Sequence, residues 1–176
     1  MGERKKASTK KLRRPWRAGQ KRVVEFGEWL CEEVLRAVPH RHFVFSIPKI
    51  LRRYFLYDRK LLSELSRCAW ETLKEFFQQA VPEKDAVPGA IIAIHSFGDF
   101  LGWHPHLHIL CTDGCFSGSG MFCVAPLFAL KHLEEIFRHK VFKMLLSKGK
   151  IIQDSVDPPA LRFKVQKLTC RHGSML

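Results

Sequence analysis

The residues with the clearest chemical potential in this chain are three histidines in the segment "GWHPHLHILCTDGCF", residues 102–116. His104, His106 and His108 occupy alternate positions. Alternate side chains of an extended strand point to the same face, so neighbouring imidazoles can bind a divalent cation or contact a phosphate. A histidine pair that leaves coordination positions open suits a metal that also polarises a phosphate oxygen. We therefore predict a metal site at His106 and His108.

Pro105 limits which of the histidines take part. Proline has no amide hydrogen to donate to a sheet, so we expect strand pairing to begin after Pro105. His106 and His108 then lie on one face with Leu107 turned away, whereas His104 need not point in the same direction. The simplest alternative is that the histidines form a half-exposed polar face of a strand and bind nothing.

A third ligand is expected beside the pair, because metal sites that act on a substrate commonly use three protein ligands. His95 lies near the end of the preceding apolar run, and Asp99 begins the loop between the two strands. Either residue can complete the site. We favour His95, since an antiparallel neighbour can bring its side chain opposite His106 and His108.

The charge of the chain favours a polyanionic partner. Its 176 residues include 30 Lys or Arg against 17 Asp or Glu, a net charge of +13. Ten of the first 22 residues are Lys or Arg, which predicts a disordered basic arm that neutralises phosphates. Basicity that serves solubility alone is the alternative. The residues expected to contact DNA phosphates are Arg13, Arg14, Arg17, Lys21, Arg22, Lys49, Arg52 and Arg53.

The sequence also bears on the cell compartment and on the state of the cysteines. The sequence shows no signal peptide and no apolar run of membrane-spanning length, so we expect a cytoplasmic chain whose six cysteines are reduced thiols. Cys111 and Cys115 flank an Asp-Gly turn with a spacing unlike that of a zinc knuckle, which predicts buried thiols. Trp16 and Trp103 are candidates for stacking on an unpaired base, with packing as the alternative.

The hydrophobic periodicity predicts an α+β sandwich of helices and antiparallel strands. The expected helices are 21–38, 49–57, 58–80 with Asp58 as N-cap, and 126–148. The side chains expected to be buried in the third helix are Leu62, Leu65, Ala69, Leu73, Phe76 and Ala80, and in the fourth Leu127, Leu130, Leu133, Phe137, Val141 and Met144. The expected strands are 41–48, 90–97, 106–112 and 116–124. We expect the strand "AIIAIHSF", residues 90–97, to be buried on both sides, and Asp113-Gly114 to form a hairpin turn.

Two segments of the chain resemble a known family. "FGDFLGWHPHLHILCTDG", together with "HRHFVFSIPKILRRYFLYDRKLLSEL" upstream, resembles the two-tyrosine HUH transposases of rolling-circle insertion sequences. The likeness runs from about Gln20 to Lys150. The name HUH denotes a histidine, a bulky hydrophobic residue and a histidine, and His106-Leu107-His108 meets this pattern.

The resemblance implies both a fold and an activity. It implies a five-stranded antiparallel β-sheet flanked by α-helices, with the histidine pair on a central strand. It further implies that the pair and a third polar ligand hold Mg²⁺ or Mn²⁺ against single-stranded DNA at insertion-element ends. In the family a tyrosine on a C-terminal helix then attacks the phosphate in DNA transposition. The expected setting is bacterial, in the nucleoid.

The chain departs from the family at both ends of the likeness. It has no cysteine before Cys31, where the family carries a zinc-binding segment, and no tyrosine after His108. Tyr54 and Tyr57 lie upstream and are expected to be packing residues. We therefore expect a truncated copy that binds metal and DNA without strand transfer. Its expected parts are a basic arm, residues 1–22, a transposase-like domain, 23–150, and a divergent tail, 151–176.

Two other functions fit parts of the sequence. The His-x-His-x-His pattern also fits histidine-triad nucleotide hydrolases, in which His106 would attack an α-phosphate without a metal. Pro105 counts against this reading, because all three histidines should then belong to one regular strand. A non-catalytic DNA-binding remnant is the other alternative, and the missing downstream tyrosine favours it.

Overall fold

The computed structural model describes residues 22, 25–98, 102–127, 129–152 and 161–168. The chain separates into two compact units, residues 1–37 and 38–176, which are described separately. The three-part division expected from the sequence stays a prediction.

The first unit contains one helical segment in its described part. Residues 25–29 are α-helical and continue into the π-helix η1 (Leu30–Val34), which ends where Leu35 takes up an extended conformation. The expected helix over residues 21–38 is therefore too long, since the helix ends four residues before Val38. Its apolar side chains are not buried either: Phe26 is 58% exposed and Trp29 51%.

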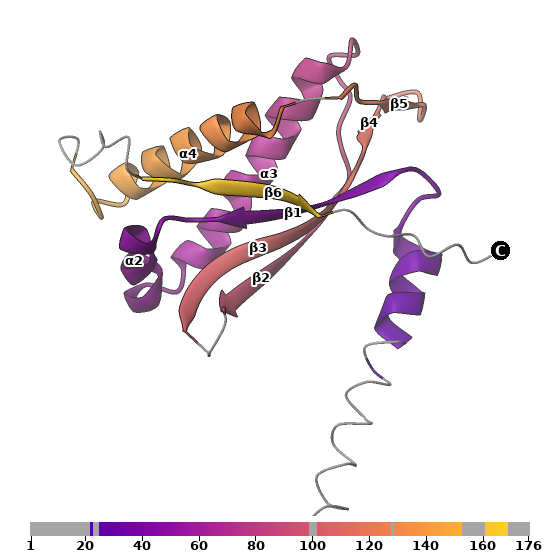
Figure 1. The fold of residues 1–176 in the computed structure, drawn as a ribbon. Coiled ribbons are helices and arrows are strands. Elements are labelled where there is room, and N and C mark those ends of the chain that lie inside the picture. Colours follow the sequence, from indigo (N-terminus) through magenta and orange to yellow (C-terminus); the bar gives the residue numbers. More distant parts are fainter. Residues whose placement is uncertain (1–21, 23–24, 99–101, 128, 153–160, 169–176) are drawn as a thin grey trace, which may run out of the picture. The chain divides into compact units, whose positions relative to one another are not determined.

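The second unit is built on a four-stranded antiparallel sheet in the order β2-β3-β1-β6 (Figure 1). Its strands are β1 (His40–Ser46), β2 (Ala90–Phe97), β3 (Trp103–Thr112) and β6 (Lys164–Leu168). Its helices are η2 (Lys49–Leu51), α2 (Arg52–Tyr57), α3 (Leu61–Ala80) and α4 (Leu130–Ser147). The short strands β4 (Gly114–Phe116) and β5 (Phe122–Val124) form a separate ribbon. This arrangement confirms the expected α+β fold with an antiparallel sheet and helices.

One face of the sheet forms the core with α3 and α4. Phe43 and Phe45 of β1 and Leu107 and Ile109 of β3 are fully buried, in alternation with half-buried neighbours. The Phe45 ring packs edge-on against Phe137 of α4 at 4.8 Å between centroids. Of the α3 side chains expected to be buried, Leu62, Leu65, Ala69, Leu73 and Phe76 are buried, and Ala80 at the end of the helix is only partly buried. Because alternate residues of β1 and β3 enter this core, the residues between them point to the opposite face.

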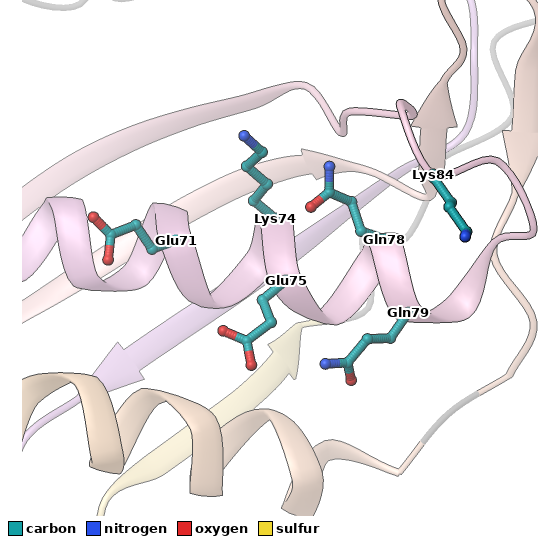
Figure 2. A pocket seen from close by; sticks show the side chains of 6 residues that line it. All are labelled: Glu71, Lys74, Glu75, Gln78, Gln79 and Lys84. Carbon is teal, nitrogen blue, oxygen red and sulfur yellow. The ribbon is translucent and has the colours of Figure 1, made fainter.

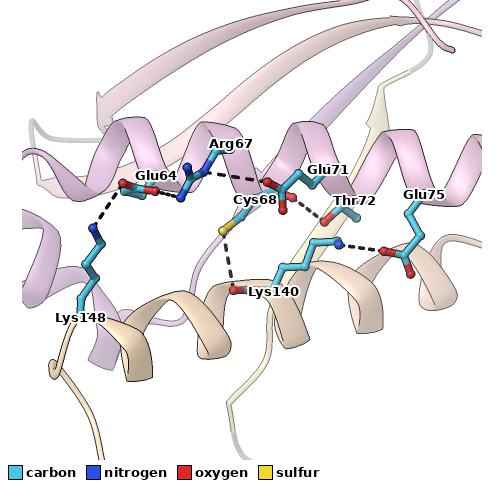
Figure 3. A network of polar contacts seen from close by, with 8 residues as sticks. All are labelled: Glu64, Arg67, Cys68, Glu71, Thr72, Glu75, Lys140 and Lys148. Atoms are coloured by element: carbon cyan, nitrogen blue, oxygen red, sulfur yellow. Dashed lines mark hydrogen bonds and ion pairs between the residues drawn. The ribbon is translucent and has the colours of Figure 1, made fainter.

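Polar contacts line the rim of the interface between α3 and α4 (Figure 3). Lys140 of α4 pairs with Glu75 of α3 at 2.7 Å, and Lys148 pairs with Glu64 at 3.5 Å. The Cys68 thiol lies 3.7 Å from the carbonyl oxygen of Lys140. Ion pairs exposed to solvent contribute little, typically below about 1 kcal/mol, so the apolar core between the helices carries most of the stability.

Several boundaries differ from the expected ones. Asp58 is not the N-cap of α3: that place falls to Lys60, and Asp58 pairs instead with Lys150 at 3.1 Å. Helix α4 begins at Leu130 rather than at Pro126, so Leu127, expected to point inward, is 91% exposed.

The strands bring further corrections. β2 is an edge strand of which no residue is buried, so the expectation of burial on both sides is wrong. Asp113-Gly114 does not turn β3 back on itself, because β4 pairs with β5 instead. The described sheet has four strands where the family resemblance implied five. One of them, β6, lies in the segment that the sequence set apart as a divergent tail and pairs with β1.

No helix in the described part of the chain combines the length and apolar character that a membrane span needs.

Candidate metal centre

The sheet register places the expected metal ligands side by side. His106 of β3 lies directly opposite His95 of β2 on one side and Ser46 of β1 on the other. His108 lies in the next row of the same face, between Ala93 and Val44. Opposite residues of an antiparallel ladder share a face, so all three histidines project from the side of the sheet away from the core.

The three imidazoles are close enough to share one ion. One ring nitrogen from each of His95, His106 and His108 lies within 4.8 Å of the others. Metal–nitrogen bonds of about 2.1 Å hold two ligands of one ion at most about 4.2 Å apart, so small side-chain rotations close the site. His95 is exposed and the other two are half-buried, which leaves the cluster open to solvent on one side.

A β-bulge shapes the start of the histidine strand. Pairing does not begin after Pro105 as expected: β3 starts at Trp103, opposite Phe97, and the register shifts before His106 meets His95. Pro105 falls inside this irregular stretch, where its missing amide hydrogen breaks no regular ladder bond. His104 lies beside His106, with ring centroids 5.0 Å apart, so the two rings are neighbours after all.

Hydrogen bonding selects the ligand atom of His106. Its Nδ1 lies 2.7 Å from the carbonyl oxygen of His104. A carbonyl oxygen only accepts, so Nδ1 must carry the hydrogen, and Nε2 keeps the lone pair that binds a metal. The carbonyl that orients this predicted ligand thus lies only two residues before it, on the same strand.

His108 is favoured in its neutral form. Burial lowers its pKa from the ordinary value, and the neighbouring His95, His106 and His42 lower it further because they disfavour another positive charge. A neutral imidazole offers a lone pair, whereas the protonated ring cannot bind a metal. The ring of His95 lies beside that of His108, at 4.3 Å between centroids.

The other expected site residues are only partly placed. Asp99, Arg13, Arg14, Arg17, Lys21 and Trp16 lie outside the described residues, and Arg22 is exposed in the first unit. Lys49 and Arg53 are exposed on η2 and α2, and Arg52 is half-buried. Trp103 donates from Nε1 to the carbonyl oxygen of Arg52 at 2.9 Å, which holds α2 beside the beginning of β3. The DNA contacts of these basic residues stay predictions.

The two tyrosines have different environments. Tyr54 packs against the core as expected, but Tyr57 is 86% exposed and is therefore not a packing residue. Cys111 and Cys115 are buried thiols, as predicted, and burial raises their pKa values to about 12 and about 11. Thiols held in the protonated form make poor zinc ligands.

Two residues near the histidines were not singled out by the sequence. His42 of β1 places Nε2 3.1 Å from Nδ1 of His108, although 66 positions separate them. Lys164 of β6 pairs opposite Ser46 and so lies in the same row as His95 and His106. The alternation in "HRHFVF" puts His42 on the polar face of its strand, but only the pairing of β1 with β3 reveals its neighbour.

A concave region lies along α3, away from the histidines (Figure 2). It is an open depression of about 490 Å³ lined by Glu71, Lys74, Glu75, Gln78, Gln79 and Lys84. Its two acidic and two basic residues cancel, so it offers no preference for a polyanion. None of the residues expected to bind metal or DNA lines it.

A known family matches the part of the chain that carries this cluster. A family described as "Putative transposase" (Y2_Tnp) matches residues 89–167, from the start of β2 into β6. The transposase for insertion sequence element IS801 of Pseudomonas savastanoi pv. phaseolicola is 34% identical over 84 residues, 48% of this chain. The alignment spans only 20% of that relative's length. No solved structure matches the chain significantly. Residues 89–167, which include the histidine strand β3, are thus similar to the Y2 transposase family that the sequence resembles.

Proposed function

We propose that this chain is the metal- and DNA-binding part of a HUH-type transposase that acts on single-stranded DNA at the ends of a mobile element. The observation that carries the proposal is the convergence of His95, His106 and His108 on the sheet face away from the core. The net charge of +13 and the match to the transposase family support DNA as the partner.

The three side chains fit a divalent cation with open coordination positions. His106 has its Nδ1 engaged by a carbonyl and so offers Nε2, while the Nδ1 of His108 faces His42. Three imidazole nitrogens leave room for phosphate oxygens and water on the exposed side of His95. Mg²⁺ prefers oxygen ligands, so this all-nitrogen cluster, among the described residues, favours Mn²⁺. Asp99 would add an oxygen ligand if its loop reaches the site.

The proposed chemistry is electrostatic. A bound cation supplies positive charge that stabilises the charge developing on the oxygens of a scissile phosphate. His106 and His108 hold fixed positions because their strand is central and its other face is buried. Lys164, two strands away from His106 at about 4.8 Å per strand, adds a positive charge along the path of the DNA backbone.

The family reaction uses a tyrosine nucleophile that follows the histidine pair, and this sequence has no tyrosine after His108. We propose that the 176-residue polypeptide binds metal and DNA but forms no phosphotyrosine bond by itself. Tyr57 is exposed, yet it precedes the histidines on the short helix α2 instead of following them as in the family.

Fluorescence anisotropy with a labelled single-stranded oligonucleotide tests the proposal. We expect Mn²⁺ to strengthen binding, a chelator to reverse the gain, and the H106A/H108A variant to lose only the metal-dependent part. His139→Ala is the matched control, because His139 is exposed on α4, which covers the other face of the sheet. If the DNA affinity of the unmodified chain were the same with and without Mn²⁺, the proposed role of the metal in DNA binding would be contradicted. Denaturing gels of the same mixtures should show no covalent adduct, and an adduct would overturn the missing-nucleophile proposal.

A further inference from the structure

His42 contacts a ligand of the proposed metal site without being one of the ligands. It lies on β1 opposite Leu110, while the neighbouring Val44 lies opposite His108. Its ring reaches diagonally across the ladder, so that its Nε2 is 3.1 Å from Nδ1 of His108 and the ring centroids are 5.2 Å apart. His42 is half-buried, as is His108, which protects this contact from competition by water.

We propose that His42 is a positioning residue of the metal site. It accepts a hydrogen bond from Nδ1–H of His108 and so holds His108 in the tautomer whose Nε2 carries the lone pair. This inference rests on the proposed metal-binding function. His42 itself does not bind the ion in this arrangement, because the nitrogen that meets His108 is occupied by that hydrogen bond.

The direction of the hydrogen bond decides whether His108 can serve as a ligand. If His42 donated from Nε2, Nδ1 of His108 would be the acceptor and its Nε2 would carry the hydrogen. His108 would then have no lone pair left for a cation. With His108 as the donor, its Nε2 is free, and neutral His42 carries its own hydrogen on Nδ1. Metal binding and the observed contact are compatible only in this second arrangement.

The two proposed ligands on β3 are thus each oriented by a hydrogen bond at Nδ1, but the partners differ. His106 is oriented by the backbone carbonyl of His104 on its own strand, at 2.7 Å. His108 is oriented by a side chain from the adjacent strand, 66 residues away in sequence. Such partners of metal-bound histidines typically change metal affinity by about 10- to 100-fold when removed. Pairing of β1 with β3 therefore completes the site as well as the sheet.

Substitutions that separate hydrogen bonding from shape test the proposal. His42→Phe keeps a ring of similar size but has no acceptor, and we expect Mn²⁺ affinity to fall by about 10- to 100-fold. His42→Gln keeps an acceptor oxygen, and we expect affinity to stay within about threefold of the unmodified chain. His40→Phe is the matched control, since His40 lies two residues earlier on the same strand, opposite Thr112. Mn²⁺ binding is measured by electron paramagnetic resonance of the free ion.

A second readout does not depend on metal. Nitrogen-15 NMR of the metal-free chain should show His108 with its hydrogen on Nδ1, and the H42F variant should lose this preference. His108 hydrogenated on Nε2 in the unmodified chain, or H42F with unchanged Mn²⁺ affinity, overturns the role of His42. If the unmodified chain binds no Mn²⁺ while the NMR result holds, the metal-binding function fails and the hydrogen bond stands. If H42F does not fold, the NMR spectrum and H42Q decide the question.

Discussion

Three imidazoles from two adjacent strands lie within 4.8 Å of one another, and this proximity is the basis of the proposed chemistry. The sequence offered two candidates for the third ligand, His95 and Asp99. Only His95 lies among the described residues, and its position opposite His106 is the one that an antiparallel neighbour provides.

His95→Ala should therefore weaken Mn²⁺ binding much more than Asp99→Ala does. Loss of one of three nitrogen ligands removes a metal–nitrogen bond, so we expect a drop of at least about tenfold for His95→Ala. Isothermal titration calorimetry of both variants measures the difference. If the larger loss falls on Asp99→Ala, the carboxylate is the third ligand and His95 is only a neighbour.

The cysteines of the core give a prediction that depends on pH. Burial raises the pKa of the Cys68 and Cys115 thiols to about 11 and that of Cys111 to about 12. The folded chain thus prefers protonated thiols, and this contribution to stability is present below the unfolded pKa of 9.0 and is lost as pH rises towards 11 to 12. Thermal unfolding should accordingly move to lower temperature above pH 9.

Alkylation at neutral pH measures the same burial. Iodoacetamide should modify the exposed Cys31 well before Cys111 and Cys115, which should react only after unfolding. Peptide mapping by mass spectrometry follows each thiol separately. Equal rates for Cys31 and Cys111 would mean that β3 opens readily.

Strand β3 has two different faces, and each should respond to substitution in its own way. Leu107 is fully buried between the two histidines of the proposed site. Leu107→Ala should lower the free energy of unfolding by about 2–5 kcal/mol, because it removes buried methyl groups and leaves a cavity. Leu56→Ala on α2 is the control, since Leu56 is 47% exposed. Urea unfolding followed by circular dichroism gives both values, and equal losses would contradict the assignment of the core face.

Individual strands and helices were easier to predict from the sequence than the pairing between strands. Alternation of apolar and polar residues identified β1 and the histidine part of β3, and a 3.6-residue hydrophobic periodicity identified the buried side of α3. Both patterns are visible in the sequence because they depend only on residues close together in the chain. The apolar run of β2 was read as a doubly buried strand, yet it lies at an edge. A run of apolar residues does not reveal whether a strand has one neighbour or two.

Long-range pairing also explains the site residues that were missed. His42 and Lys164 come near the histidines through β1 and β6, and nothing in the adjacent sequence marks which strands will meet. His106 and His108, by contrast, share a strand and were identified together. The expectation for Pro105 was wrong because a β-bulge lets the chain keep a proline inside a strand.

The net charge of the whole chain predicts how DNA binding responds to salt. Each phosphate neutralised on a single strand contributes about −0.7 to the slope of log affinity against log salt concentration. Arg53→Ala should therefore make that slope shallower by about 0.7 while leaving Mn²⁺ affinity unchanged. Arg138→Ala on α4 is a charge-matched control on the covered side of the sheet. Anisotropy titrations at several salt concentrations provide the slopes, and an unchanged slope for Arg53→Ala removes Arg53 from the DNA contact.

The most direct measurement of the central claim is a Mn²⁺ titration followed by electron paramagnetic resonance on the unmodified chain and on H106A, H108A and H139A. We expect one bound ion per chain, a loss of binding of at least about tenfold in each of H106A and H108A, and no change in H139A. Equal Mn²⁺ binding by all four proteins, or none by the unmodified chain, would contradict a metal centre on β3.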